Sequence, residues 1–338
     1  MHLPFTVERW FRLSLFACKL TRANLTRVGR LKPLKKLFSS FRSSMALRPA
    51  PYQLVDIGAN LTGHAFNNRD LEAVIGRAKE SGICKIIVTG TSVEVTKEAM
   101  RLCRLYPGYL YFTAGTHPHD AKHFTPECID RLEELAGQPE CVAIGECGLD
   151  FNRMFSPRET QLKVFDAQVQ LACKLKKPLF VHEREAHEAL VDILRKYDGQ
   201  LREVVIHCFT GTAEEAKTYL DMGFYIGLTG YLWKDTLERG VKFMLRNRLL
   251  PLNRLLVETD APYMYPNIQA KKVCQDVREK ISSHASHFVL NHCSFQRNEP
   301  CSLPATVEMI AAYGCFTPDE VAMRTTMNAV KIFGLTFD

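Results

Sequence analysis

The stretch of sequence that decides the fold is AIGECGLD, residues 143–150. It contains the end of an apolar run, Val142 to Ile144, and a glycine that directly precedes the carboxylate of Glu146. A short apolar run followed by a glycine-flanked turn predicts a buried strand that places Glu146 at its carboxyl end. Parallel α/β proteins keep their chemistry at the carboxyl ends of their strands. The question that follows is whether other strands end in the same way.

Three further apolar runs finish on side chains that can bind a metal or transfer a proton. Residues 180–181 lead into His182, residues 204–206 into His207, and residues 255–257 into Glu258-Thr259-Asp260. One such ending has little meaning, but four in one chain indicate a shared site at one end of a set of parallel strands.

Strand-like and helix-like segments alternate from residue 53 onward. Helices are indicated by apolar residues at i, i+3, i+4 and i+7, as in residues 70–81. The expected strands are 54–57, 85–89, 109–115, 141–145, 178–182, 203–207, 224–228 and 254–258. Eight strands over roughly 280 residues predict a (β/α)8 TIM barrel. An open doubly wound sheet is the alternative, but it would not gather the ends of strands four, five, six and eight around one point.

Residues 266–300 interrupt this alternation. They are polar and include three histidines, His284, His287 and His292. We expect them to form a long loop after the eighth strand, over the mouth of the barrel.

The charge of the chain is concentrated at its N-terminus. The chain has 338 residues and a net charge of +7, but residues 1–48 contain eleven basic residues and one acid, Glu8, so residues 49–338 carry −3. The body is therefore not a strongly basic nucleic-acid binder, and any DNA contact there would use a local groove. No apolar run approaches the roughly 18–20 residues that span a bilayer, so no membrane association is expected.

The domain organisation that follows is a basic N-terminal extension, residues 1–48, and one barrel domain, residues 49–338. The extension is rich in Arg, Lys and Ser and poor in acids, which is typical of an organelle transit peptide; a disordered basic tail is the alternative reading. The twelve cysteines form no C-x-x-C pair and indicate free thiols in a reducing compartment. We therefore expect an intracellular protein, mitochondrial if the extension is a transit peptide and otherwise cytoplasmic or nuclear.

The four strand-end residues Glu146, His182, His207 and Asp260 have the chemistry of a catalytic metal site. Mixed carboxylate and imidazole ligands suit Zn, Mn or Mg and lack the thiolates of a structural zinc site. Four ligands on a six-coordinate ion leave positions open for water and substrate. Such an ion lowers the pKa of its bound water and polarises the bond under attack.

Several motifs, in order along residues 53–337, make the chain resemble the TatD-family deoxyribonucleases, metal-dependent hydrolases built on a (β/α)8 barrel. The motifs are DIGANL at 56–61, GTHPHD at 115–120, AIGECGLDFNR at 143–153, IHCFTG at 206–211, ETDAP at 258–262 and RNEP at 297–300. The resemblance implies divalent-metal hydrolysis of DNA phosphodiesters, with 3′→5′ exonuclease activity. It carries the metal ligands onto Glu146, His182, His207 and Asp260.

The resemblance also implies roles for residues outside the ligand set. Asp260 would take the proton of the attacking water, with Glu146 beside it, and His117, His119 and Arg184 would stabilise the charge that develops on the phosphoryl oxygens. Two arginines have alternative roles. Arg153 and Arg297 either contact the nucleic-acid backbone or pair with Asp150 and Glu299.

The first strand departs from the broader family pattern. Many members carry two histidines there, which help to hold a second metal, whereas this chain has Gly58 and Asn60. We therefore expect one or two divalent ions, with Mg first and Mn or Zn as alternatives. Asn60 is expected to contact a second ion weakly or to face the substrate.

Two competing functions remain open from the sequence. A metal barrel of this kind can hydrolyse another phosphoester or an amide, although many of those sites use a lysine at the end of strand four, where this chain has Glu146. A weakened barrel that only binds nucleic acid is the other. The substrate expected from the resemblance is DNA, with single strands or 3′ ends favoured, and the sequence predicts no oligomeric state.

Overall fold

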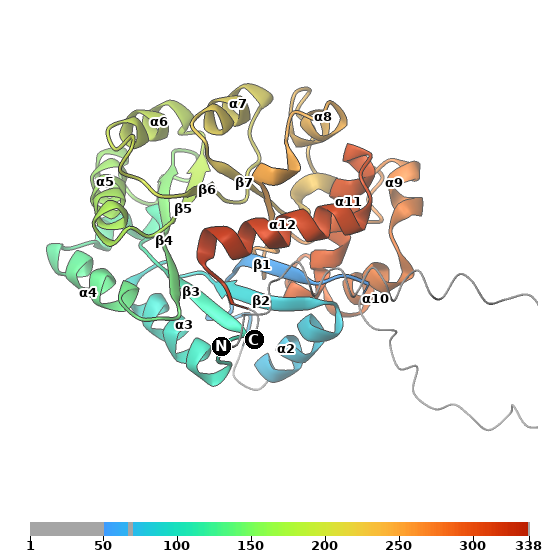
Figure 1. Cartoon of the computed structure of the whole chain (residues 1–338), viewed down its shortest axis with the longest axis horizontal. Helices are drawn as coiled ribbons and strands as arrows, with labels where there is room; N and C mark the ends of the chain where they lie inside the picture. The colour runs from blue at the N-terminus through green and yellow to red at the C-terminus, as the bar shows by residue number, and fades with distance from the viewer. Residues whose placement is uncertain (1–50, 67–69, 337–338) are drawn as a thin grey trace, which may run out of the picture. The chain divides into compact units, whose positions relative to one another are not determined.

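The computed structural model describes residues 51–66 and 70–336. In these residues eight parallel strands form one sheet in chain order (Figure 1). Their bounds are β1 Leu54–Ala59, β2 Ile83–Val88, β3 Leu110–Ala114, β4 Cys141–Asp150, β5 Leu179–Arg184, β6 Val204–Ile206, β7 Tyr225–Leu228 and β8 Leu255–Val257. A parallel bridge between Ala59, at the end of β1, and Ala261, in the segment after β8, joins the first strand to the last part of the sheet. The predicted TIM barrel is therefore confirmed, and an open sheet is excluded.

Helices surround the strands, as Figure 1 shows. They are α2 Leu71–Glu80, α3 Val93–Leu105, α4 Pro126–Ala136, α5 Arg158–Leu175, α6 His187–Arg195, α7 Ala213–Asp221, α8 Val241–Arg246, α11 Leu303–Gly314 and α12 Pro318–Phe333. Each longer helix buries one apolar stripe against the strands; α2, for example, buries Leu71, Val74, Ile75 and Ala78, as its spacing predicts. Short 3-10 turns η1 Pro118–His123, η2 Gly230–Trp233, η3 Leu252–Arg254 and η4 Pro300–Ser302 complete the chain.

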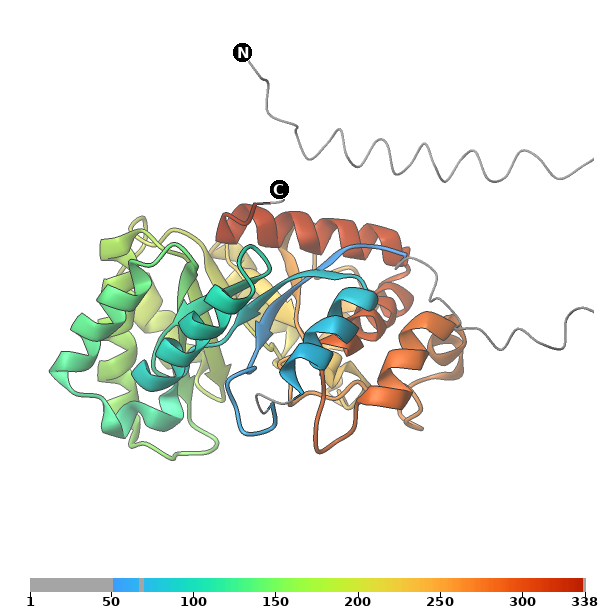
Figure 2. The same ribbon diagram turned by 90° about the horizontal axis from the view of Figure 1, so that it is seen from below.

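Helix α12 closes the amino end of the barrel. Its Ala329, Ile332 and Phe333 belong to the same buried cluster as side chains inside the barrel, among them Val55, Phe180 and Leu256. A capping box of Thr317 and Glu320 begins this helix. Figure 2 shows α12 across one end of the barrel and the loop after β1 leaving from the other. The closed end leaves only the carboxyl ends of the strands for a site.

Two sequence predictions about local structure are wrong. Residues 266–300 are not one long loop, because they contain α9 Gln275–Lys280 and α10 Ser283–His292. Helix α10 is capped by Ser282 and buries a short apolar stripe of Ala285, Phe288 and Val289. In the sequence this stripe stands among polar residues, so it does not give a clear helical pattern. The fourth strand also does not end before Glu146. It continues to Asp150, with a register shift against β5 between Ile144 and Cys147.

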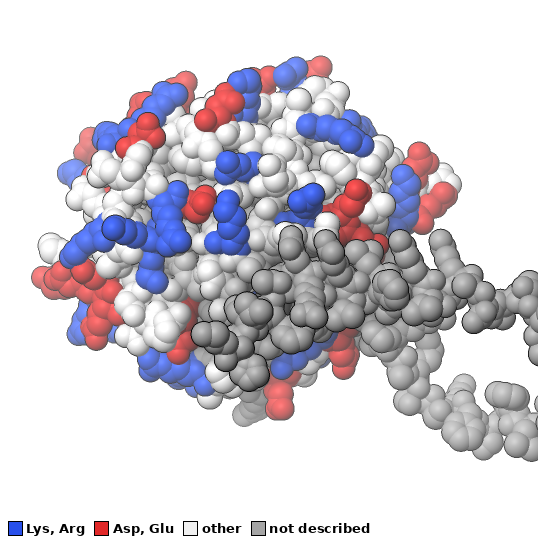
Figure 3. Space-filling model, in the orientation of Figure 1, with Lys and Arg blue, Asp and Glu red and all other residues white. Residues whose placement is uncertain are grey.

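The basic extension, residues 1–48, lies outside the described residues. Its role as a transit peptide or a basic tail therefore stays a prediction. Among the described helices none is long and apolar enough to cross a membrane. On the face of the molecule drawn in Figure 3, which α12 crosses, positive and negative side chains are interspersed.

Candidate metal centre

The predicted ligands come from different strands and meet at the carboxyl end of the barrel. Glu146 lies on β4 and His182 on β5, while His207 directly follows β6 and Asp260 stands three residues after the end of β8. His117 follows β3 and precedes η1. Because these strands are parallel and adjacent in order, their carboxyl ends converge on one point.

Three imidazoles surround a single carboxylate oxygen of Glu146. Its Oε1 lies 2.8 Å from His207 Nε2, 3.0 Å from His182 Nδ1 and 3.1 Å from His117 Nε2. Burial raises the pKa of the Glu146 carboxyl, but His207 and His117 outweigh it and hold the pKa well below its usual range. A buried anion that gathers nitrogen donors in this way, without a thiolate, is a donor set that fits a divalent ion.

The His207 ring is oriented by a carboxylate behind it. Its Nδ1 lies 3.3 Å from Oε2 of Glu258, which is fully buried and also accepts the backbone N–H of Cys208 at 2.6 Å. Both carboxylates can only accept, so without an ion the ring donates from Nδ1 to Glu258 and from Nε2 to Glu146. The contact with Glu258 fixes the hydrogen on Nδ1 and leaves Nε2 as the nitrogen that could bind an ion. Burial lowers the pKa of His207, but Glu146 and Glu258 raise it well above its usual value. This is the carboxylate–histidine arrangement that metal-binding histidines use.

Asp150 plays a similar part on the other side of the site. Its Oδ2 accepts His119 Nε2 at 2.8 Å and lies 3.5 Å from His182 Nε2. Its Oδ1 accepts the backbone N–H groups of Asn152 and Arg153. Burial raises the pKa of Asp150, but His119 and His182 lower it below its usual range. Asp150 thus holds the His119 ring in place, whereas His182 Nε2 is buried and has no hydrogen-bond partner among the described residues.

His117 is arranged as a hydrogen-bond donor. Its Nδ1 accepts the backbone N–H of His119 at 3.1 Å, so the neutral ring carries its hydrogen on Nε2, the atom that faces Glu146. Burial lowers the pKa of His117 and favours this neutral form. Its Nε2 is close enough to Glu146 and His182 to form a three-ligand cluster with them. The bond at Nδ1 nevertheless favours donation to an oxygen over binding an ion.

Asp260 is held by the first strand. Its Oδ1 accepts the side-chain amide of Asn60 at 2.9 Å, and its backbone N–H donates to the Gly58 carbonyl at 2.9 Å. Burial raises the pKa of Asp260 to about 7; His207 opposes this shift, while Glu146 and Glu258 add to it. Asn60 therefore orients this carboxylate.

The three predicted arginines have different surroundings. Arg184 is half-buried two residues after His182 on β5, and within the described part of the chain its guanidinium makes no hydrogen bond or ion pair. Arg153 is exposed beside the site. Arg297 instead pairs with Asp70 at 2.6 Å and with Glu299 at 3.2 Å, so it is not brought into the cluster. Its partners include the Glu299 that the sequence offered as an alternative to nucleic acid.

Two residues that position the histidines were missing from the predicted site: Glu258 and Asp150. Both stand inside motifs that the sequence analysis quoted, Glu258 two residues before Asp260 and Asp150 four residues after Glu146. A rule that looks for a carboxylate partner behind each ligand histidine would have directed attention to them.

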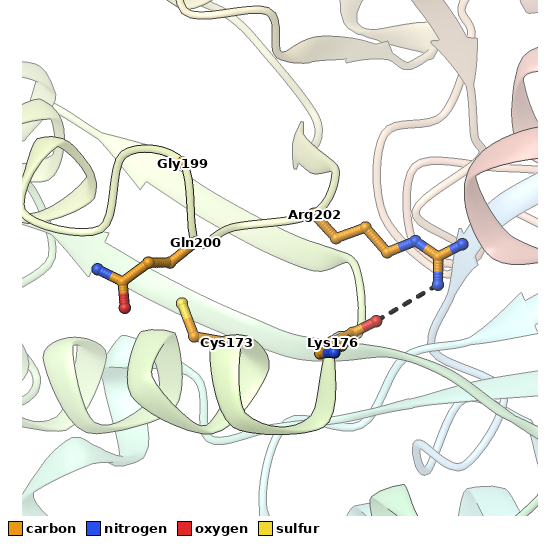
Figure 4. Close-up of a pocket in the computed structure, with 5 residues that line it drawn as sticks. All are labelled: Cys173, Lys176, Gly199, Gln200 and Arg202. Atoms are coloured by element: carbon orange, nitrogen blue, oxygen red, sulfur yellow. Dashed lines mark hydrogen bonds between the residues drawn. The ribbon is translucent and has the colours of Figure 1, made fainter.

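A separate pocket lies at the opposite end of the barrel. It is lined by Cys173, Lys176, Gly199, Gln200 and Arg202 (Figure 4). These residues belong to the end of α5 and to the segment before β6, so they stand at the amino ends of the strands. The Arg202 guanidinium donates to the Lys176 carbonyl at 3.4 Å. No carboxylate or imidazole lines this pocket, which leaves the strand-end cluster as the catalytic candidate.

Comparison with known proteins agrees with this geometry. Residues 55–334 match the family model described as TatD related DNase. The "3'-5' ssDNA/RNA exonuclease TatD" of Erwinia tasmaniensis is 40% identical over 282 residues, 83% of this chain and 100% of that protein. The protein of the same name from Salmonella typhimurium is 38% identical over 84% of this chain and 100% of its own length.

Solved structures give the same answer for the fold. A TatD-family hydrolase from Entamoeba histolytica superposes with a TM-score of 0.72 at 26% identity and covers 85% of this chain and 100% of its own. The TatD homologue YJJV from Escherichia coli superposes with a TM-score of 0.69 at 26% identity, covering 84% of this chain and 98% of its own.

Proposed function

The chain belongs to the family of TatD-related DNases and is a hydrolytic nuclease, and from this premise we propose that it removes nucleotides from the 3′ ends of single-stranded DNA with a divalent metal ion. The observation that carries the proposal is the convergence of three imidazoles on the buried carboxylate of Glu146, at one open end of the barrel. The direction and strand preference are taken from relatives named 3'-5' ssDNA/RNA exonucleases.

The residues that would hold the ion are Glu146, His182, His207 and Asp260. Carboxylate ligands suit Mg and Mn, and imidazole ligands suit Zn; we propose Mg first, with Mn or Zn as alternatives, and one or two ions per chain. When bound, such an ion supplies a Lewis acid at the phosphate and lowers the pKa of a water at neutral pH. Glu258 would hold the His207 ring through Nδ1 and so leave Nε2 for the ion, and Asp150 holds the neighbouring His119 ring.

The chain's own side chains would perform the remaining steps. Asp260, with one oxygen held by Asn60, accepts the proton of the attacking water on its other oxygen. His117 donates from Nε2 to a non-bridging phosphate oxygen, and Arg184, which lacks a protein partner in the described residues, adds a positive charge there. His119 stands beside His117, with ring centroids 4.2 Å apart. Arg153 is exposed at the rim, where it would meet the backbone of the strand.

The test is release of nucleotides from end-labelled single-stranded DNA by the full chain, with Mg, Mn, Zn or a chelator, and with Glu146→Ala as the control. We expect the enzyme to release mononucleotides and to shorten a 5′-labelled strand step by step from its 3′ end. With chelator, or in the variant, we expect neither. A 5′-blocked strand should be degraded normally and a 3′-blocked strand should survive.

Each other outcome has a meaning of its own. Degradation of RNA at an equal rate would widen the substrate to single-stranded nucleic acid in general. Cleavage of a small phosphodiester without cleavage of DNA would favour a different phosphoester hydrolase. No turnover with any ion, by protein that binds the ion, would refute the nuclease proposal.

A further inference from the structure

Aromatic side chains from three loops form a cluster at the mouth of the barrel. Phe295, in the segment after α10, lies 5.0 Å from Tyr265 and 5.8 Å from Trp233, measured between ring centroids, with interplanar angles of 70° and 67°. Despite these contacts 63% of Phe295 remains exposed. A large apolar ring that packs against two aromatic neighbours and is otherwise exposed to solvent is a candidate binding surface.

The support beneath Phe295 is fixed by hydrogen bonds. The indole N–H of Trp233 donates to the Tyr265 carbonyl at 2.9 Å, which ties the turn η2 to the segment after β8. The backbone of the Phe295 turn is closed by Ser294 N–H to the Arg297 carbonyl at 2.8 Å. Two edge-on aromatic neighbours add attraction beyond simple burial. Phe295 is therefore held ready for a ligand and loses little freedom on binding.

The cluster lies on the same chain segments as the metal centre. Tyr263 is 62% exposed, and its backbone N–H donates to the Asp260 carbonyl at 2.9 Å. On the side of Phe295, the backbone N–H of Asn298 donates to the Pro262 carbonyl at 2.8 Å. The exposed aromatic rings thus stand on segments that are hydrogen-bonded to Asp260, a proposed ligand, and to Pro262, two residues after it.

The charges around the cluster suit a phosphate backbone. Lys234 directly follows Trp233 and is exposed, as is Lys272. The ammonium group of Lys242 lies between the two segments and donates to the carbonyls of Trp233 at 3.4 Å and Lys272 at 3.5 Å. Aromatic faces beside lysines are the combination that binds single-stranded nucleic acid without regard to sequence.

We propose that Phe295, supported by Trp233 and Tyr265, is a stacking platform for an unpaired base of the single-stranded substrate. The inference rests on the proposed function and adds to it a site for the strand outside the reacting phosphate. A base inside a duplex is already stacked on its neighbours and must leave the helix to reach the ring, so the platform also favours single strands over duplex DNA. Every base has an aromatic face, and the contact would therefore tolerate any sequence.

The experiment compares Phe295→Leu, which keeps an apolar side chain without an aromatic face, with Phe295→Trp, which keeps the face. Leu105→Ala is the matched control, because Leu105 is 59% exposed at the end of α3 that leads into β3, at the other end of the barrel. Binding of fluorescent (dT)12, and of a 12-residue abasic strand with the same backbone, is measured by anisotropy in chelator. Steady-state cleavage of (dT)12 and of bis(p-nitrophenyl) phosphate is measured with Mn.

The expected result is a rise of about 5- to 150-fold in the Kd of Phe295→Leu for (dT)12, the range for loss of one stacked base. Affinity for the abasic strand, turnover of the small phosphodiester and kcat on (dT)12 should stay within two-fold of wild type, and Phe295→Trp should restore the affinity. The Leu105→Ala control should change none of these values.

Three results would overturn the platform. An unchanged Kd of Phe295→Leu for (dT)12 would show that Phe295 does not contact the strand. An equal loss of affinity for the abasic strand would show that the contact is not with bases. A wild-type dimer that Phe295→Leu converts to a monomer would make the cluster a protein interface. Failure of the proposed function can be told apart from failure of the platform, because the wild type itself would then cleave neither DNA nor the small phosphodiester.

Discussion

Replacing Glu258 by glutamine tests whether the carboxylate behind His207 sets the metal affinity of the site. The substitution Glu258→Gln keeps the size of the side chain and removes its charge. In the structure the carboxylate accepts His207 Nδ1–H at 3.3 Å and Cys208 N–H at 2.6 Å. An amide has one acceptor oxygen in place of two, so at least one of these bonds is lost or weakened.

The expected magnitude follows from the role of such carboxylates. Removing the partner behind a metal-binding histidine typically costs about 10–100-fold in metal affinity or activity, which is ~1.4–2.8 kcal/mol. The assay is calorimetric titration of the full chain with Mn, beside cleavage of single-stranded DNA at saturating Mn. We expect the Kd for Mn to rise within this range while part of the activity returns at high Mn.

A matched control separates this effect from loss of any buried charge. Glu308 on α11 is also buried, and it accepts hydrogen bonds from Tyr52 and Ser282 away from the site. Glu308→Gln should lower thermal stability and leave the Mn affinity unchanged. If Glu258→Gln bound Mn as tightly as wild type, the claim that Glu258 holds the His207 ring so that its Nε2 binds the ion would be refuted.

Four further changes have directions that the structure fixes. Asp260→Asn removes the proton acceptor and should lower single-turnover cleavage by roughly 10²–10⁴-fold at saturating metal; near-normal turnover would exclude it as the base. His117→Ala removes a donor to the phosphate and should lower kcat by roughly 10²–10³-fold with little change in KM, in the same assay. Burial raises the pKa of Asp56 to about 8, so its stabilising contribution is fully present below pH ~4, declines above that and is gone once the pH has risen through 8; urea unfolding should show a fall in stability between pH ~4 and 8 that Asp56→Asn flattens. Gly58→His should weaken Mn binding, because a Cβ there would come within 2.4 Å of Glu258 Oε2; tighter binding would mean that the histidine adds a ligand.

The barrel, and the place of the proposed ligands at the carboxyl ends of its strands, could be predicted because both are encoded locally. Each strand is a short apolar run, and the residue at or just after its end faces the shared site, so Glu146, His182 and His207 are found without knowledge of any contact. The β4 boundary was the exception. The strand continues past Glu146 through a register shift, a feature that depends on pairing with β5 and has no local signature.

The partners of the histidines could not be predicted, since they join residues that are far apart in the chain. His207 and Glu258 are 51 residues apart, and His119 and Asp150 are 31 apart. The hydrogen positions on the rings follow from these contacts, so the sequence cannot decide that His117 is a donor. Helix α10 was missed for a different reason: its apolar stripe is short and stands among polar residues, and packing against the barrel rather than local pattern stabilises it.

The first strand shows how its unusual residues serve the eighth. Asp56, Gly58 and Asn60 stand at alternate positions along the chain, the spacing that puts side chains of a strand on one face. Asp56 accepts the backbone N–H of Thr259 at 2.9 Å and its hydroxyl at 2.5 Å, and Asn60 donates to Asp260.

Gly58 contributes space to the same arrangement. The Glu258 carboxylate fills the room that a side chain at position 58 would need. Each of the three positions on the first strand therefore matches one residue of the segment 258–260, and together they fix the carboxylate behind His207 and the carboxylate of Asp260. This chain uses a glycine and an asparagine on the first strand to hold the acids of segment 258–260 in place, and a ligand set built in this way relies on the other strands for its imidazoles.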